Sequence, residues 1–105
     1  MKKITNLDLS LKEKNYPSYN DLIKLLVELG YNRVNMVLDP DEFSVRGSII
    51  DIYPETHSHP IRLEYDDDEL HRLNSFDTHS QRSLSKLKKT SISKVDTERT
   101  KQFSK

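Results

Sequence analysis

Two arginines, Arg46 and Arg62, are the side chains of this 105-residue sequence best suited to specific recognition. Each lies in a stretch in which apolar and polar residues alternate. Alternation is typical of a half-buried strand, so both guanidinium groups should project from the polar face of a sheet. A planar guanidinium can bind a carboxylate or a phosphate through two parallel hydrogen bonds. The pair therefore predicts either a surface that binds a partner or cross-strand ion pairs with Asp51 or Glu64.

Other residues that could do chemistry lack the spacing that known sites need. Five carboxylates lie between Glu64 and Glu69 without the glycine and glutamate positions of an EF-hand loop, and they predict a solvated hairpin. His57 and His59 form only a weak zinc pattern, because the sequence has no cysteine. No serine lies in a nucleophile elbow, and the two glycines are too few for a phosphate-binding loop. We therefore expect no enzyme, no catalytic residue, no metal, no cofactor and no small-molecule substrate.

One helix is predicted to support the strands that carry the arginines. Apolar residues recur with helical periodicity from Tyr19 to Leu29 and form one wide apolar stripe. Ser18 is a suitable N-cap, and Asp21 follows in the first turn, where the helix dipole favours a carboxylate. Gly30 stands where a left-handed residue commonly ends a helix.

The remaining periodic stretches indicate short strands. They cover residues 7–12, 31–37, 43–53, 61–65 and 69–76. A glycine interrupts the third stretch, which indicates a bulge or a close backbone approach. Consecutive hairpins, one of them turning at three aspartates, favour antiparallel pairing. The predicted fold class is α+β, a mostly antiparallel small sheet with one main helix packed on one face.

Composition limits the core and the class of protein. Apolar residues make up 33% of the sequence, against a usual value of about 45–50%, so we expect a thin core. The absence of cysteine excludes a disulfide framework. No apolar run is long enough for a transmembrane helix and no signal-peptide pattern is present, so we expect a cytoplasmic protein with no membrane partner.

Charge is distributed unevenly along the chain. Residues 1–81 hold 9 basic and 15 acidic groups, whereas residues 82–105 hold 8 basic and 2 acidic groups. We expect a domain at residues 1–84 and a basic, partly disordered C-terminal tail at residues 85–105, within which residues 87–95 could add one strand. Such a tail is either solvated or makes weak, sequence-independent contacts with nucleic acid. The candidate contacts are Lys86, Lys88, Lys89 and Lys94.

Several blocks of the sequence resemble one family, in that family's order. Residues 42–54 (EFSVRGSIIDIYP) match its most distinctive stretch, and residues 26–37 and 59–65 match on either side. The family is the UvrB interaction domain, the UvrA-binding domain of UvrB and of bacterial transcription-repair coupling factor. The resemblance covers roughly residues 7–84, and residues 76–83 (FDTHSQRS) resemble the coupling factor more than UvrB.

This resemblance implies a non-catalytic protein-interaction domain of bacterial nucleotide excision repair that docks a UvrA-like subunit. It implies a docking face made by Arg46, Arg62 and the pair Tyr65-Asp66. The family often has an aromatic at the second position of that pair, so Asp66 replaces an apolar anchor that would contribute about 2 kcal/mol. The family's proteins also carry ATP-binding motor domains, for which this sequence has no motif.

Overall fold

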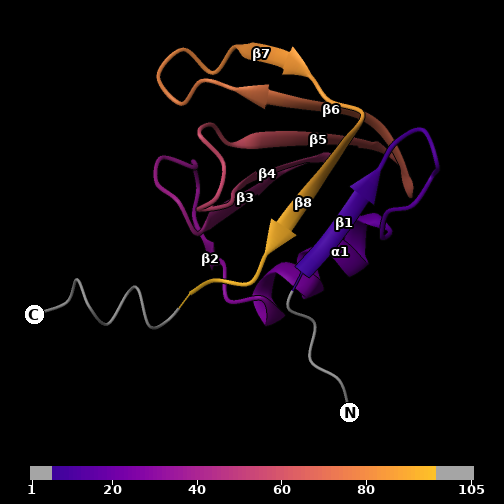
Figure 1. The fold of residues 1–105 in the computed structure, drawn as a ribbon, viewed down its shortest axis with the longest axis horizontal. Coiled ribbons are helices and arrows are strands. Elements are labelled where there is room, and N and C mark those ends of the chain that lie inside the picture. Colours follow the sequence, from indigo (N-terminus) through magenta and orange to yellow (C-terminus); the bar gives the residue numbers. More distant parts are fainter. Residues whose placement is uncertain (1–5, 97–105) are drawn as a thin grey trace, which may run out of the picture.

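The computed structural model describes residues 6–96, which form one helix and two sheets (Figure 1). The helix, α1, spans Tyr19–Glu28. The strands are β1 (Asn6–Ser10), β2 (Asn32–Arg33), β3 (Glu42–Arg46), β4 (Ile49–Tyr53), β5 (Ile61–Asp66), β6 (Glu69–Phe76), β7 (Ser83–Lys86) and β8 (Lys89–Ser93). Strands dominate, and the α+β class predicted from the sequence is confirmed.

The larger sheet has six strands in the order β2-β3-β4-β5-β6-β7. Neighbours from β3 to β7 pair antiparallel, as predicted, and β2 pairs parallel with β3. The strand predicted over residues 31–37 is too long, because only Asn32–Arg33 pair. Beyond them a Glu42 carboxylate oxygen accepts hydrogen bonds from the backbone N–H groups of Leu38 and Asp39, each at 2.9 Å. These bonds hold the chain in a loop instead of a strand.

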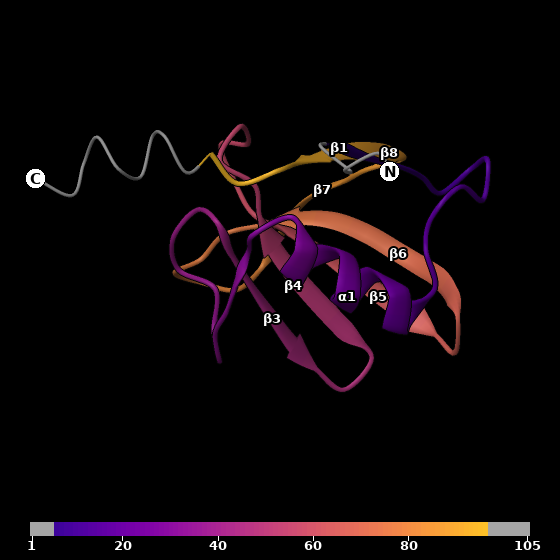
Figure 2. The same ribbon diagram turned by 90° about the horizontal axis from the view of Figure 1, so that it is seen from below.

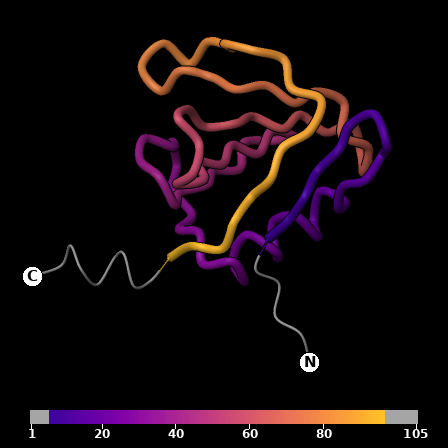
Figure 3. The backbone as a smooth tube through the Cα atoms, in the orientation of Figure 1, coloured from indigo at the N-terminus to yellow at the C-terminus, as the bar shows by residue number. Residues whose placement is uncertain are grey.

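The first and last described strands form a separate two-stranded sheet. β1 and β8 pair antiparallel, with Asn6 opposite Ser93. Figures 2 and 3 show this pair over the same face of the larger sheet as α1. The second sheet is a difference from the single sheet predicted, since it joins segments from opposite ends of the described chain. Leu9 and Ile92 carry its apolar side into the core.

The helix begins and ends close to its predicted bounds. The Ser18 hydroxyl accepts a hydrogen bond from the Asp21 N–H at 3.3 Å and so caps the first turn. Leu29 is the C-cap, and Gly30 follows with a φ of 96°. A Cβ atom at Gly30 would also lie 3.2 Å from Val95 Cβ. Glycine is therefore favoured there both by the left-handed backbone and by the close approach of the C-terminal segment.

The connection between β3 and β4 differs from the prediction. Arg46 lies opposite Ile49 across the two strands, so Gly47 and Ser48 form a tight hairpin turn, not a bulge within one strand. Gly47 has a φ of 58°, which glycine adopts at little steric cost. The hairpin between β5 and β6 is as predicted, with Asp67 at its tip.

The main core lies between the larger sheet and the layer that α1 and the β1–β8 pair form (Figure 2). Leu22 and Leu26 of α1 are fully buried. They pack in one cluster with the inward residues of the larger sheet: Phe43, Ile50, Ile52, Ile61, Leu63, Tyr65, Leu70 and Leu73. The two-residue alternation in β4 and β5 thus directs one face of the larger sheet into the core.

The C-terminal part of the described chain carries β7 and β8. β8 lies within residues 87–95, where the sequence left room for one more strand. The boundary at residue 84 stays a prediction, and the disorder expected toward the C-terminus concerns residues 97–105, which lie outside the described residues. Within residues 6–96 no helix is long and apolar enough to cross a bilayer.

Candidate functional site

Cross-strand register gathers the candidate residues on the face of the larger sheet that α1 does not cover. Ser44, Asp51, Arg62 and Asn74 lie opposite one another across β3, β4, β5 and β6. Arg46 lies two residues beyond Ser44 and therefore on the same side. We call this side the polar face. The predicted orientation of the two arginines is confirmed, and Asp51 lies between them.

Asp51 is the buried centre of the polar face. Its side chain is 3% exposed, and Arg62 binds it as a planar fork. Arg62 Nε donates to Oδ1 at 2.8 Å, and Nη2 donates to Oδ2 at 2.9 Å. The hydrogen bonds to Asp51 raise the pKa of Arg62, against the opposing effect of burial. Since a buried charge without a partner is strongly destabilising, this fork is a structural ion pair.

Arg62 makes further contacts within the chain. It donates to the backbone carbonyl oxygen of Gln81 at 3.3 Å and to the side-chain Oε1 of Gln81 at 2.9 Å. Its guanidinium carbon lies 4.2 Å from the centre of the Phe76 ring. Only 13% of the side chain is exposed. Of the two interpretations that the sequence left open, ion pairing with Asp51 is the arrangement that the structure shows for Arg62.

Arg46 is held more loosely. Its Nη2 atom lies 3.4 Å from Asp51 Oδ2, and half of the Arg46 side chain is exposed. An exposed pair at this distance contributes about 0–1 kcal/mol to stability. The guanidinium of Arg46 is therefore open to solvent and to a partner, whereas that of Arg62 is mostly enclosed.

Of the other two candidate residues, Tyr65 points away from the polar face, whereas Asp66 lies on the same side of β5 as Arg62, at the end of the strand. Tyr65 belongs to the core, where its ring meets the rings of Tyr16 and Tyr19 edge-on at 6.4 and 5.7 Å. Its hydroxyl donates to the Pro17 carbonyl oxygen at 2.9 Å, and burial raises its pKa. Asp66 is exposed at the end of β5, beside the acidic hairpin turn. Tyr65 thus supports the strand from within, and Asp66 faces solvent.

Sequence reasoning missed Gln81 and Phe76 as members of this cluster. Both lie in the block 76–83 that resembles the coupling factor, and that block was the available signal. Alternation alone could not place them, because the register of β6 with β7 shifts between Ser75 and Phe76. Gln81 also has a φ of 63°, a turn conformation that no periodic pattern predicts.

Arg46 lies half exposed at the surface of the polar face. One hollow, of about 680 Å³, follows β6 and β7, and another, of about 460 Å³, adjoins the β4–β5 loop and β8. Neither is lined by Arg46 or Arg62. Among residues 6–96, no three His, Asp or Glu side chains are grouped as metal ligands would be. An open surface with a half-exposed guanidinium suits a macromolecular partner better than a small molecule.

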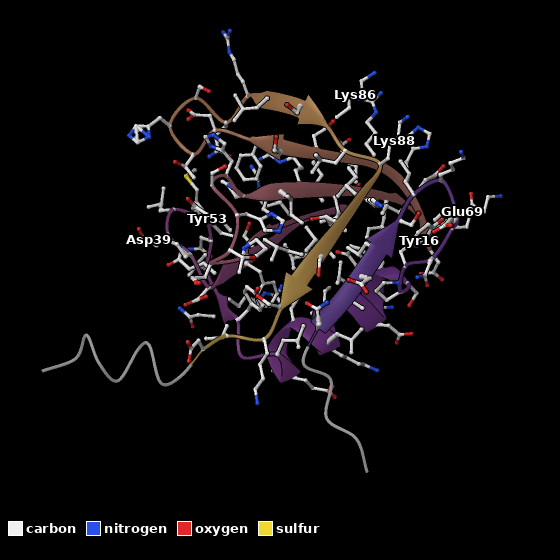
Figure 4. All side chains as sticks on the ribbon, in the orientation of Figure 1. Tyr16, Asp39, Tyr53, Glu69, Lys86 and Lys88 are labelled. Atoms are coloured by element: carbon white, nitrogen blue, oxygen red, sulfur yellow. The ribbon has the colours of Figure 1, made fainter. Side chains whose placement is uncertain are left out.

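The four candidate lysines for nucleic acid lie on other elements. Lys86 ends β7, Lys89 begins β8, and Lys88 and Lys94 lie outside the strands. All four are exposed. Figure 4 shows Lys86 and Lys88 pointing away from the body of the molecule.

Comparison with known proteins agrees with the sequence blocks. The model of the UvrB interaction domain family matches residues 9–96. The transcription-repair-coupling factor of Bacillus subtilis is 47% identical over 73 residues, which are 70% of this chain and 6% of the relative. That of Mycobacterium tuberculosis is 41% identical over 69 residues, 66% of this chain and 6% of the relative.

A second kind of relative shares the domain. The UvrABC system protein B of Clostridium botulinum (strain Loch Maree) is 35% identical over 87 residues, 82% of this chain and 13% of the relative. The chain therefore spans only a small part of the curated relatives that it matches. Because the family model matches most of the chain, including the helix, the whole larger sheet and both Arg46 and Arg62, this chain belongs to the UvrB interaction domain family.

Proposed function

We propose that this chain is a non-catalytic docking domain that binds a UvrA-like subunit of bacterial nucleotide excision repair in the cytoplasm. Membership of the UvrB interaction domain family, and relatives that are named for transcription-repair coupling and for the UvrABC system, support this assignment. The observation that carries it is Arg46, a half-exposed guanidinium at the Val-Arg-Gly position of the family's most distinctive stretch.

The proposed mechanism is charge complementarity on the polar face. Arg46 donates to a carboxylate or carbonyl group of the partner, and Asp51 keeps it in place through the 3.4 Å contact. Charges at the rim of the surface steer the encounter and set its salt dependence. Arginine is among the residues that most often dominate interface energy, so this one side chain can contribute a large share of the affinity.

Asp66 makes the proposed interface differ from that of family members with an aromatic at this position. An exposed carboxylate at the end of β5 repels an acidic partner surface and attracts a basic one. We therefore expect Asp66→Phe to tighten docking by about tenfold, through added apolar burial and removal of a charge.

Calorimetric titration of the chain with the UvrA protein of the same bacterium tests the proposal. We expect binding with a Kd in the micromolar range or tighter, weaker at higher salt, and lost in Arg46→Glu. Lys24→Glu is the matched control, because it makes the same charge reversal at an exposed position of α1, outside the polar face. The absence of binding at low and at high salt would contradict the proposal.

Nucleic-acid binding through Lys86, Lys88, Lys89 and Lys94 is the second candidate, favoured by the exposure of all four side chains. Such binding would rest on phosphate contacts and would fall steeply with salt. Replacing the four lysines with glutamine separates the two functions. It would abolish DNA binding, measured by fluorescence anisotropy, and leave UvrA docking in place.

A further inference from the structure

We infer that Arg62 and Gln81 form a positioning pair, which fastens the loop between β6 and β7 to the Asp51 cluster that also holds Arg46, and so makes that loop part of the docking surface. This inference rests on the proposed function and refines it. Arg62 does not bind the partner with its own guanidinium. It positions Asp51 and Gln81, and through them Arg46 and the loop. The loop consists of residues 77–82.

The donors of Arg62 are almost fully used inside the chain. A guanidinium has five N–H groups. Four hydrogen bonds leave the Arg62 guanidinium, two to the carboxylate of Asp51 and two to Gln81. Its flat face lies over the Phe76 ring at 4.2 Å. A partner carboxylate could bind this group through two parallel bonds only by displacing Asp51 or Gln81.

The loop that Gln81 ends is ordered by its own hydrogen bonds. Asp77 accepts from the Ser80 N–H at 2.8 Å through its carboxylate and from the Gln81 N–H at 2.7 Å through its backbone carbonyl. Gln81 Nε2 donates to the Thr78 carbonyl oxygen at 2.8 Å. The loop is thus a preformed turn, and the bonds from Arg62 to Gln81 fasten it to the sheet.

Asp51 links this fastened loop to Arg46. Both arginines contact its Oδ2 atom, Arg62 at 2.9 Å and Arg46 at 3.4 Å. While Arg62 satisfies the carboxylate, Arg46 is bound only weakly and keeps donors for a partner. If Arg62 is removed, the buried carboxylate loses its main partner, and Arg46 becomes the nearest cation that can neutralise it. Loss of Arg62 should therefore also withdraw Arg46 from the docking surface.

The effect of a Gln81 substitution on docking separates this positioning role of Arg62 from direct contact with the partner. If Arg62 itself binds the partner, Gln81→Ala frees the donor that Oε1 occupied and leaves docking unchanged or tighter. If Arg62 positions the loop, Gln81→Ala weakens docking by about fivefold to tenfold, as expected for a lost hydrogen bond to a charged group. Gln81→Glu keeps an oxygen for Arg62 and should restore most of the affinity. Arg62→Lys keeps the charge but not the fork, and should weaken docking about as much as Gln81→Ala.

Tyr31→Phe controls for general destabilisation. It removes the 2.8 Å hydrogen bond from the Tyr31 hydroxyl to the Ser93 carbonyl oxygen, away from the polar face, and should leave docking unchanged. Amide hydrogen exchange of residues 77–82 in the free chain gives a readout that needs no partner. We expect faster exchange there in Gln81→Ala and Arg62→Lys but not in Tyr31→Phe.

The experiment is calorimetric titration of the wild-type chain and these four variants with UvrA. Weaker docking in Gln81→Ala and Arg62→Lys, recovery in Gln81→Glu and no change in Tyr31→Phe would support the inference. Unchanged or tighter docking by Gln81→Ala, or an equal loss in Tyr31→Phe, would overturn the inference while leaving the docking function standing. Failure of the wild-type chain to bind would overturn the docking function, and the docking role of the loop with it.

Discussion

The two faces of the larger sheet are stabilised in different ways. On the face under α1 and the β1–β8 pair, the strands contribute apolar side chains to one cluster. On the polar face, buried Asp51 is satisfied by one firmly held arginine and one loosely held arginine. Ile50 and Asp51, neighbours on β4 that are 0% and 2% exposed, show the contrast within one step of the chain.

The contrast supports the proposal that the polar face is the surface that recognises a partner. An apolar cluster depends on volume and pattern, and related side chains can replace one another at small cost. A buried carboxylate must be satisfied by particular partners in particular positions. The groups that contact it are therefore held in defined positions. The polar face therefore holds Arg62 and the β6–β7 loop in a fixed arrangement and leaves Arg46 half exposed beside Asp51.

The largest expected effect is the loss of stability when the Asp51 ion pair is removed from the polar face. Asp51→Ala leaves the mostly enclosed Arg62 without its carboxylate and should lower the free energy of unfolding by about 3–5 kcal/mol. Ile50→Val, one residue away on the apolar face, should cost about 1 kcal/mol. Urea denaturation measures both. Equal costs for the two variants would show that the Asp51 cluster is not the main support of the polar face.

The next effect separates stability from docking. Arg46→Ala removes a half-exposed side chain whose ion pair contributes little, so the free energy of unfolding should change by about 0–1 kcal/mol. Docking of UvrA should weaken by about thirtyfold, equivalent to about 2 kcal/mol at an interface hot spot. Denaturation and calorimetry on one preparation give both numbers. A large loss of stability with unchanged docking would reverse the roles assigned to the two arginines.

A smaller effect tests the apolar face through pH. Burial raises the pKa values of Tyr31 and Tyr65, so the fold favours their neutral phenols. Their contribution is complete below the ordinary tyrosine pKa of about 10 and is lost as the pH rises above it. Tyr65→Phe should cost about 1 kcal/mol at neutral pH, through loss of the hydrogen bond to Pro17, and should flatten the fall of stability above about pH 10. An unaltered alkaline profile would contradict this account.

The smallest effect on docking is expected at the exposed lysines Lys86 and Lys88. Lys86→Gln with Lys88→Gln removes two exposed charges at or beyond β7, the edge strand that lies four strands along the larger sheet from the β3 strand of Arg46, so the Kd for UvrA should change by less than about twofold. Surface plasmon resonance at two salt concentrations measures this change. A loss as large as that of Arg46→Ala would move the docking surface to β7 and β8.

Local pattern predicted the elements and the faces well. Alternation predicted that Arg62 lies on one face of the sheet and that Leu63 and Tyr65 lie on the other face. The capping residues Ser18 and Gly30 predicted where the helix begins and ends. These features depend on residues that are close in sequence. The hairpin at Asp67 was predictable for the same reason.

Long-range pairing and loop geometry were not predictable from local pattern. The β1–β8 sheet joins Asn6 to Ser93, and no periodicity indicates which distant strands will meet. The contacts of Arg62 with Gln81 and Phe76 require a register shift in β6 and a left-handed residue in the following loop. The sequence therefore predicted that Arg62 lies on the polar face, and the structure was needed to show that it is held there.

Hydrogen exchange of the chain, followed by mass spectrometry with and without UvrA, maps the surface that UvrA covers. We expect UvrA to protect peptides spanning residues 42–53 and 76–83, which carry Arg46, Asp51 and the loop fastened by Arg62. We expect no added protection in α1. Protection confined to residues 84–96, or to the helix, would contradict docking through the polar face.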